Sequence, residues 1–179
     1  MSQHILMTSK EMNSAIEKMA DDIIKSEKDM KNVVLIGIVT RGVCLAERLV
    51  KTIKKKTKIE PGIGSLDITF YRDDIGSIAT QPLAKETQIP FDLTDKKIIL
   101  VDDVIFTGRS TRAALDGLMD YARPRSIQLA VLVERKHREL PIQADYVGKK
   151  AATKYDDKVQ VYLKETDKID KVVVYETKN

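Results

Sequence analysis

The sequence contains few of the residues that build disulfides and metal sites. Its 179 residues include one cysteine, Cys44, and two histidines, His4 and His137. One cysteine excludes an internal disulfide framework and an all-thiolate metal site, and two histidines argue against a histidine-rich zinc site. Tryptophan is absent and aromatic residues make up 5% of the chain, so an aromatic platform for stacking RNA bases is not expected.

Long apolar runs are also missing. No run approaches the roughly 20 residues needed to cross a bilayer, so no membrane association is expected. Residues 1–10 lack the basic start, apolar stretch and small-residue cleavage site of a signal peptide, and we expect a cytoplasmic protein. The net charge of +4 is too small to indicate a nucleic-acid partner by itself.

Helical and strand patterns alternate along the chain, which predicts an α/β domain around a mostly parallel sheet flanked by helices. Thr8 and Glu11 have the spacing of a capping box at the start of the first helix. Helices are predicted at 8–28, 43–55 and 109–122, the last with Ala114, Leu115, Leu118 and Met119 inward. Strands are predicted at 33–39, 64–72, 97–101 and 127–133, and in a small β-rich extension at 144–147, 159–163 and 172–176.

The whole chain, 1–179, is predicted to be a single domain. Its extension, or hood, comes mainly from residues 134–179. Residues from about 71 to 92 contain Gly76, Pro82 and Pro90 with weak periodicity, which indicates a long flexible loop. Loops of this length inside compact domains are usually functional lids or disordered segments.

The most informative motif follows the strand predicted at 97–101. Asp102 and Asp103 stand at its carboxyl end, where α/β sheets bind ligands. A loop with Thr107, Gly108 and Ser110 then opens a helix. Free N–H groups of a first helical turn, together with hydroxyls, form a phosphate cradle. Because carboxylates repel phosphate, the aspartates are better suited to the hydroxyls of a ribose, and the motif fits a 5-phosphorylated ribose.

Three other interpretations of this motif are weaker. A chance Asp-Asp with a hydroxyl that only caps the helix leaves the paired acids and Gly108 unexplained. A receiver domain places its acidic pair near the start of the chain and gives the Thr-Gly-Arg-Ser-Thr loop no role. No Gly-x-x-x-x-Gly-Lys-Ser/Thr or Gly-x-Gly-x-x-Gly sequence is present, which removes the main support for kinase, GTPase and dinucleotide-binding functions.

Residues 98–111 resemble the signature of type I phosphoribosyltransferases. The resemblance implies that family's fold, with a small hood, and binding of 5-phosphoribosyl 1-diphosphate with Mg2+ held mainly by the substrate and by no protein ligand directly. It assigns catalytic roles to Asp102, Asp103 and Arg41. Substrate and product binding is assigned to Thr40, Arg41, Gly42, Arg72, Asp102, Asp103, Val104, Ile105, Phe106, Thr107, Gly108, Arg109, Ser110 and Thr111.

One subfamily fits nearly the whole chain. Residues 67–74, 135–142 and 144–149 resemble the bacterial pyrimidine-operon attenuation regulators that are also uracil phosphoribosyltransferases. The resemblance implies synthesis of UMP from uracil, UMP-dependent binding to the leader mRNA of pyrimidine genes, and assembly as a homodimer or higher homo-oligomer. It places RNA contacts at Lys18, Arg138 and Lys149.

Departures from the subfamily's pattern concern RNA. Lys136 stands where a glycine is expected and Gln143 where a basic residue is usual, and Glu17, Asp21 and Asp22 lie among the lysines of the first helix. Acidic groups next to phosphates weaken RNA binding. Two alternatives stay open. One is an RNA-binding regulator that uses the site only as a UMP sensor, and the other is a purine phosphoribosyltransferase, because residues 134–148 set the choice of base and their pocket is not evident from the sequence. We interpret His137 as a surface residue and both Cys44 and Tyr146 as core residues.

Overall fold

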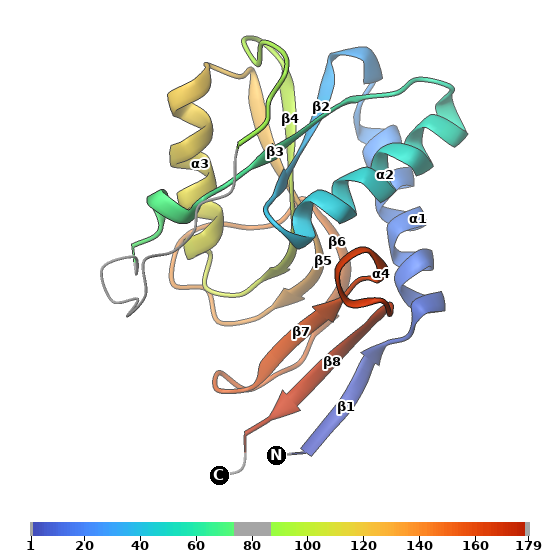
Figure 1. Ribbon diagram of the computed structural model, residues 1–179, viewed down its shortest axis with the longest axis vertical. Helices are drawn as coiled ribbons and strands as arrows, with labels where there is room; N and C mark the ends of the chain where they lie inside the picture. Colours follow the sequence, from blue (N-terminus) through green and yellow to red (C-terminus); the bar gives the residue numbers. More distant parts are fainter. Residues whose placement is uncertain (1, 74–86, 178–179) are drawn as a thin grey trace.

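The computed structural model describes residues 2–73 and 87–177. Its central element is a parallel sheet of five strands in the order β3-β2-β4-β5-β6 (Figure 1). All six residues of β2 are buried, as predicted from its unbroken apolar sequence, because a strand covered on both faces has no solvent side. The strands are β2 (Val33–Ile38), β3 (Gly62–Leu66), β4 (Lys97–Ile105), β5 (Ser126–Arg135) and β6 (Tyr146–Ala151).

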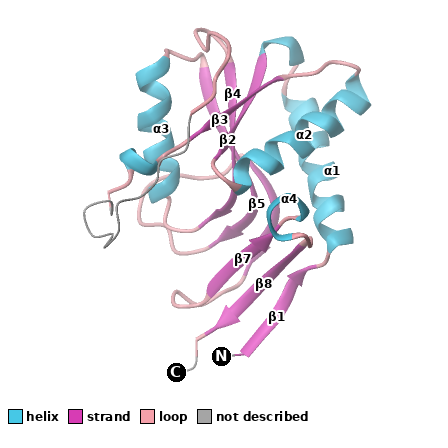
Figure 2. Cartoon of the chain, in the orientation of Figure 1, coloured by secondary structure: helices cyan, strands magenta, loops and turns pink. Residues whose placement is uncertain are grey.

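Helices cover both faces of this sheet (Figure 2). On one face, α1 (Ser9–Ser26) and α2 (Arg41–Thr57) pack against Leu35 and its same-face neighbours, and on the other, α3 (Arg109–Tyr121) packs against Ile36. Alternate residues of each strand therefore enter two separate cores. The capping box is confirmed: Thr8 Oγ1 accepts a hydrogen bond from the Glu11 N–H, and Glu11 Oε2 accepts one from the Thr8 N–H.

A second sheet, antiparallel and three-stranded, forms the hood. Its order is β1-β8-β7, from β1 (Ser2–Met7), β7 (Lys158–Tyr162) and β8 (Lys171–Glu176), and the short helix α4 (Lys164–Asp167) connects β7 to β8. The predicted β-rich extension is present, but β1 was not predicted, because four of its six residues are exposed and give no periodic signal. The segment predicted at 144–147 is not part of the hood, since β6 pairs with β5 in the parallel sheet.

Three local predictions were wrong. The strand predicted at 64–72 ends at Leu66 and is followed by a 3-10 turn, Thr69–Tyr71. Asp67 Oδ1 accepts hydrogen bonds from the N–H and hydroxyl of Thr69, which turns the chain and leaves Phe70 71% exposed. The strand predicted at 97–101 is longer than expected, because β4 continues through Asp102 and Asp103 to Ile105. Met119 does not face inward but is 58% exposed.

The predicted long loop is described only at its ends. Residues 74–86 lie outside the described residues. After them, Gln88 and Ser65 exchange backbone hydrogen bonds of 2.9 Å, so the chain returns alongside β3. Within 2–73 and 87–177, no helix combines the length and apolar character that crossing a membrane requires.

Replacing Leu100 with alanine tests the core of the sheet. Leu100 is fully buried in β4, so Leu100→Ala should lower the free energy of unfolding by about 2–5 kcal/mol. Urea unfolding followed by circular dichroism measures the change. Met119→Ala, on exposed α3 surface, is the control and should change stability by less than about 0.5 kcal/mol; equal losses in the two variants would contradict this packing.

Candidate active site

Two loops meet at the carboxyl edge of the parallel sheet because β2 and β4 are direct neighbours in it, with Gly37 opposite Val101. The loop after β2 leads into α2 through Thr40, and the peptide bond before Thr40 is cis. A Cβ added at Gly42 would lie 2.3 Å from the carbonyl oxygen of Val101. Only glycine fits at this position, so the start of α2 lies directly against β4.

Asp102 and Asp103 belong to the last part of β4, and both are half-buried. Burial, reinforced by the charge of Asp103, raises the pKa of Asp102 well above its ordinary value. The pKa of Asp103 is also raised by burial, while hydrogen bonds from Asp102 and the Val104 N–H and the charge of Arg41 oppose the rise. Two carboxylates in one site resist double ionisation. Hydrogen-bond donors or a nearby cation would stabilise the doubly ionised pair, so the pair is suited to such partners.

The predicted phosphate loop opens α3 as expected. Gly108 is the N-cap residue with φ 93° and makes no side-chain capping bond, a conformation that favours glycine. Thr107 and Ser110 line a cavity of about 520 Å³. Thr111 is buried and does not line it. First-turn N–H groups next to such a cavity have the geometry that suits an anion.

Charged residues surround this cavity. Arg72, Asp73 and Arg109 also line it. The Arg109 guanidinium donates to Asp73 at 2.5 Å and to Glu139 at 2.6 Å, so two carboxylates offset its charge and tie the loop to its neighbours. Asp73 and Glu139 were not predicted as site residues, since they reach the loop only through tertiary contacts.

Of the predicted ligand-binding residues between Asp103 and Thr107, Val104 and Phe106 are half-buried and Ile105 is buried. The Phe106 ring lies near the rings of His137 and Tyr155, with centroids 6.0 and 5.3 Å away. The Arg135 guanidinium lies 3.8 Å from the Phe106 centroid. This aromatic cluster connects the end of β4 with the segment after β5.

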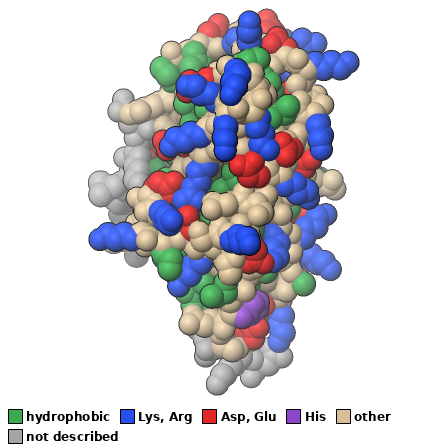
Figure 3. Space-filling model, turned by 90° about the vertical axis from the view of Figure 1, so that its right-hand side faces the viewer, with side chains coloured by type: hydrophobic (Ala, Val, Ile, Leu, Met, Phe, Trp, Pro, Cys, Tyr) green, Lys and Arg blue, Asp and Glu red, His purple; other side chains and the backbone are tan. Residues whose placement is uncertain are grey.

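The predicted RNA contacts differ in their surroundings. Lys18 is exposed on α1. Arg138 donates to the carbonyls of Phe106, Arg135 and Ile142 and to Glu134, which holds it within the fold. Lys149 donates to the Leu6 carbonyl at 2.8 Å. Seen from the side of α1 and α2, Lys and Arg side chains are interspersed with Asp and Glu (Figure 3).

The chemistry of the paired aspartates is compatible with a nearby magnesium ion that the substrate mainly holds. Hard divalent cations prefer oxygen ligands, and Mg2+ usually combines one or two carboxylates with substrate oxygens and water. A cation there would stabilise the doubly ionised form of Asp102 and Asp103, which their environment otherwise disfavours. Within the part of the chain that the structure describes, no three or more His, Cys, Asp or Glu side chains gather as a metal cage.

Comparisons with known proteins support the resemblance read from the sequence. The family profile described as phosphoribosyl transferase domain matches residues 2–166. The chain is 50% identical over 171 residues to the bifunctional protein PyrR of Deinococcus radiodurans, covering 96% of this chain and 93% of that protein. It is 49% identical over 171 residues to the protein of the same name from Thermus thermophilus, covering 96% and 94%.

Solved structures share the fold. A hypoxanthine phosphoribosyltransferase from Staphylococcus aureus matches with a TM-score of 0.72 and 19% identity, covering 97% of this chain and 92% of that one. The Trypanosoma cruzi hypoxanthine phosphoribosyl transferase matches with a TM-score of 0.73 and 17% identity, covering 96% and 90%. The predicted fold is thereby confirmed.

The raised pKa of Asp102 predicts a stabilising substitution. The folded protein binds protons at this pair more tightly than the unfolded chain, so the pair's contribution to stability is lost as pH rises above the ordinary aspartate pKa of about 3.9. Asp102→Asn keeps the carbonyl that accepts from the Asp103 N–H and removes the charge. We expect its Tm without ligands to exceed that of the wild type at pH 8, by about 2–4 °C per kcal/mol relieved.

Thermal unfolding from pH 5 to pH 8 measures this difference, which should shrink as the pH falls. Asp156→Asn, at an exposed position, is the matched control and should give no such trend. A Tm for Asp102→Asn below that of the wild type across the whole range would contradict the assignment.

Proposed function

Because this chain belongs to the phosphoribosyl transferase domain family, we propose that it is a uracil phosphoribosyltransferase that also regulates pyrimidine genes. It transfers the 5-phosphoribosyl group of 5-phosphoribosyl 1-diphosphate to uracil and gives UMP and pyrophosphate. The observation that carries the proposal is the juxtaposition of the Asp102–Asp103 pair, the phosphate loop at Gly108 and the Arg41 loop on two neighbouring strands.

In the proposed reaction the C1–oxygen bond to pyrophosphate breaks, with its electron pair kept by the leaving oxygen. A bond from C1 to uracil N1 forms, and the N1 proton is released to solvent water. The transition state resembles an oxocarbenium ion, as in glycoside cleavage. Asp102 and Asp103 bind the ribose hydroxyls and favour positive charge on the sugar. Thr107, Ser110 and the first N–H groups of α3 hold the 5-phosphate.

The leaving pyrophosphate is assigned to the loop after β2. Arg41 offers a fork of donors, and Gly42 allows backbone N–H groups to approach the anion. Bound Mg2+ supplies charge neutralisation for the diphosphate. Arg72, which lines the phosphate cavity, contributes a further positive charge to the same anionic substrate.

The regulatory activity is UMP-dependent binding to the leader mRNA of pyrimidine genes, which promotes transcription attenuation. Relatives that are about half identical over nearly the whole chain are named bifunctional, which favours two activities over a UMP sensor alone. The purine alternative has weaker support, since the hypoxanthine enzymes are under 20% identical to this chain and share only its fold. Assembly as a homodimer or higher homo-oligomer and the cytoplasmic location stay predictions.

Pyrophosphate release from 5-phosphoribosyl 1-diphosphate with Mg2+ tests the enzyme. We expect release with uracil and none with hypoxanthine, adenine or orotate. Asp103→Asn should lower kcat by about 10–1000-fold with little loss of fold, because stabilisation of the sugar's developing charge is removed. Circular dichroism controls for folding. Unchanged turnover would overturn the role of Asp103, and turnover with hypoxanthine alone would favour the purine alternative.

RNA binding is tested separately with a leader transcript of a pyrimidine operon in a filter-binding assay. Affinity should rise when UMP is added and fall with increasing salt, because phosphate contacts release counterions. Lys18→Ala should weaken binding several-fold through loss of an exposed positive charge on α1. Lys158→Ala, at an exposed position in β7, is the control. Equal effects of the two substitutions would remove Lys18 from the RNA contact.

A further inference from the structure

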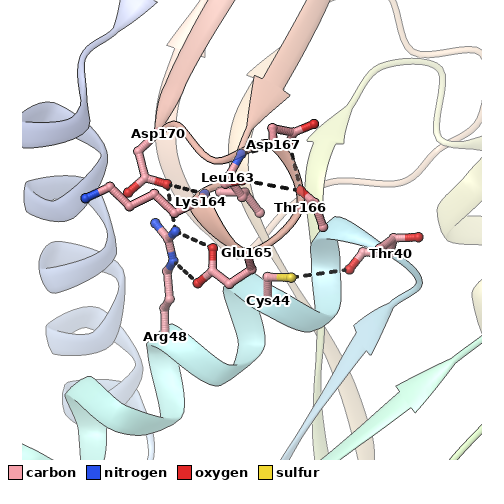
Figure 4. Close-up of polar contacts among 9 residues, drawn as sticks. All are labelled: Thr40, Cys44, Arg48, Leu163, Lys164, Glu165, Thr166, Asp167 and Asp170. Atoms are coloured by element: carbon pink, nitrogen blue, oxygen red, sulfur yellow. Dashed lines mark hydrogen bonds and ion pairs between the residues drawn. The ribbon is translucent and has the colours of Figure 1, made fainter.

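The short helix α4 of the hood is joined to α2 by ion pairs from two arginines. Arg48, near the middle of α2, donates to Glu165 at 2.9 and 2.5 Å and to Asp170 at 2.7 Å (Figure 4). The Asp170 and Arg48 side chains are 5% and 15% exposed. The Arg48–Asp170 pair is shielded from water, although the Glu165 side chain is 36% exposed, and a shielded pair holds its geometry better than surface pairs do.

The second ion pair involves the loop assigned to pyrophosphate. Arg41 Nη2 donates to Asp167 Oδ1 at 2.9 Å, and the two side chains are 30% and 19% exposed. The Nε atom of Arg41 is buried and has no hydrogen-bond partner among the described residues. The hood therefore binds the guanidinium through Nη2, while the Nε–H donor has no partner among the described residues.

The Asp167 side chain is also held by hydrogen bonds from its own segment, independently of Arg41. Its Oδ2 atom accepts hydrogen bonds from the Leu163 N–H at 2.9 Å and the Thr166 hydroxyl at 2.7 Å, and the residue is the last of α4. These hydrogen bonds and Arg41 lower the pKa of Asp167, so the carboxylate stays charged. Oδ1 thus presents a fixed negative charge to a long, flexible side chain.

We propose that Asp167 is a positioning residue for the reaction: it holds the Arg41 guanidinium at the pyrophosphate loop through Oδ1. An arginine side chain loses rotamer freedom when it is fixed, and a side chain already held by the hood loses less of that freedom when the anion binds. Asp167 does not touch the reacting atoms. The inference rests on the proposed function, because it assumes that Arg41 binds the pyrophosphate end of the substrate.

Calorimetric titration with inorganic pyrophosphate and Mg2+ provides the test. Asp167→Asn keeps an oxygen acceptor for Leu163 and removes the charge that holds Arg41. We expect pyrophosphate to bind about 3–5-fold more weakly, the upper part of the range of a partly exposed charged pair. In kinetic assays, KM for 5-phosphoribosyl 1-diphosphate should rise and KM for uracil should stay unchanged.

Glu165→Gln is the matched control on the same short helix. It removes one carboxylate from Arg48 while the Arg48–Asp170 pair remains, so it should lower Tm and leave pyrophosphate affinity within about twofold. In an Arg41→Gln background, Asp167→Asn should have no further effect on that affinity. Asp167→Glu, which keeps the charge, should bind pyrophosphate more tightly than Asp167→Asn and covers the case in which the asparagine variant does not fold.

Several outcomes would overturn the inference. Equal affinities for Asp167→Asn and Glu165→Gln would reduce Asp167 to a structural role. Tighter binding by Asp167→Asn would show that Asp167 competes with the anion for Arg41. If the wild type releases pyrophosphate with uracil but Asp167→Asn matches it in both assays, only the positioning role fails. A wild type that neither binds nor releases pyrophosphate would overturn both this role and the proposed function.

Discussion

The parallel pairing of β2 with β4 is the constraint on which the candidate site depends. It brings together two loops that are about sixty residues apart in the chain, and the contact is as close as backbone geometry allows, since a Cβ at Gly42 would lie 2.3 Å from the Val101 carbonyl oxygen. Because α2 begins against β4, the charge of Arg41 acts on Asp103 and opposes the rise in the pKa of that carboxyl. The Arg41 loop and the Asp102–Asp103 pair therefore interact electrostatically.

The sequence predicted what depends on local patterns. Unbroken apolar runs identified β2, β4 and β5, the Thr8–Glu11 box identified the start of α1, and the motif around Gly108 identified the loop that opens α3. Prediction was wrong where a polar side chain redirects the backbone, as Asp67 does before Thr69. It missed β1, whose backbone pairs with β8 at the other end of the described chain.

Charged residues that contact the predicted site residues were missed because their partners lie far away in the sequence. Asp167 and Glu139 lie in charged, exposed-looking segments, and nothing in their neighbours along the chain marks them as partners of Arg41 and Arg109. Basic residues that are close in the sequence have partners that the sequence does not show. Arg135 is buried against Phe106, and Arg138 donates hydrogen bonds to backbone carbonyls. Charge counted along a chain overstates the charge available to a nucleic acid.

The hood joins the two ends of the described chain, since β1 pairs with β8 while the parallel sheet is complete by Ala151. During synthesis β1 has no sheet partner until β8 has been made, because β8 is the only strand with which β1 pairs among the described residues. The parallel sheet can therefore form before the hood, whose pairing spans the greatest sequence separation and carries the largest loop-closure entropy. Because α4 lies between β7 and β8, the Arg41–Asp167 ion pair forms only with the hood, so a chain without a folded hood can have a folded parallel sheet and an Arg41 side chain that lacks this contact.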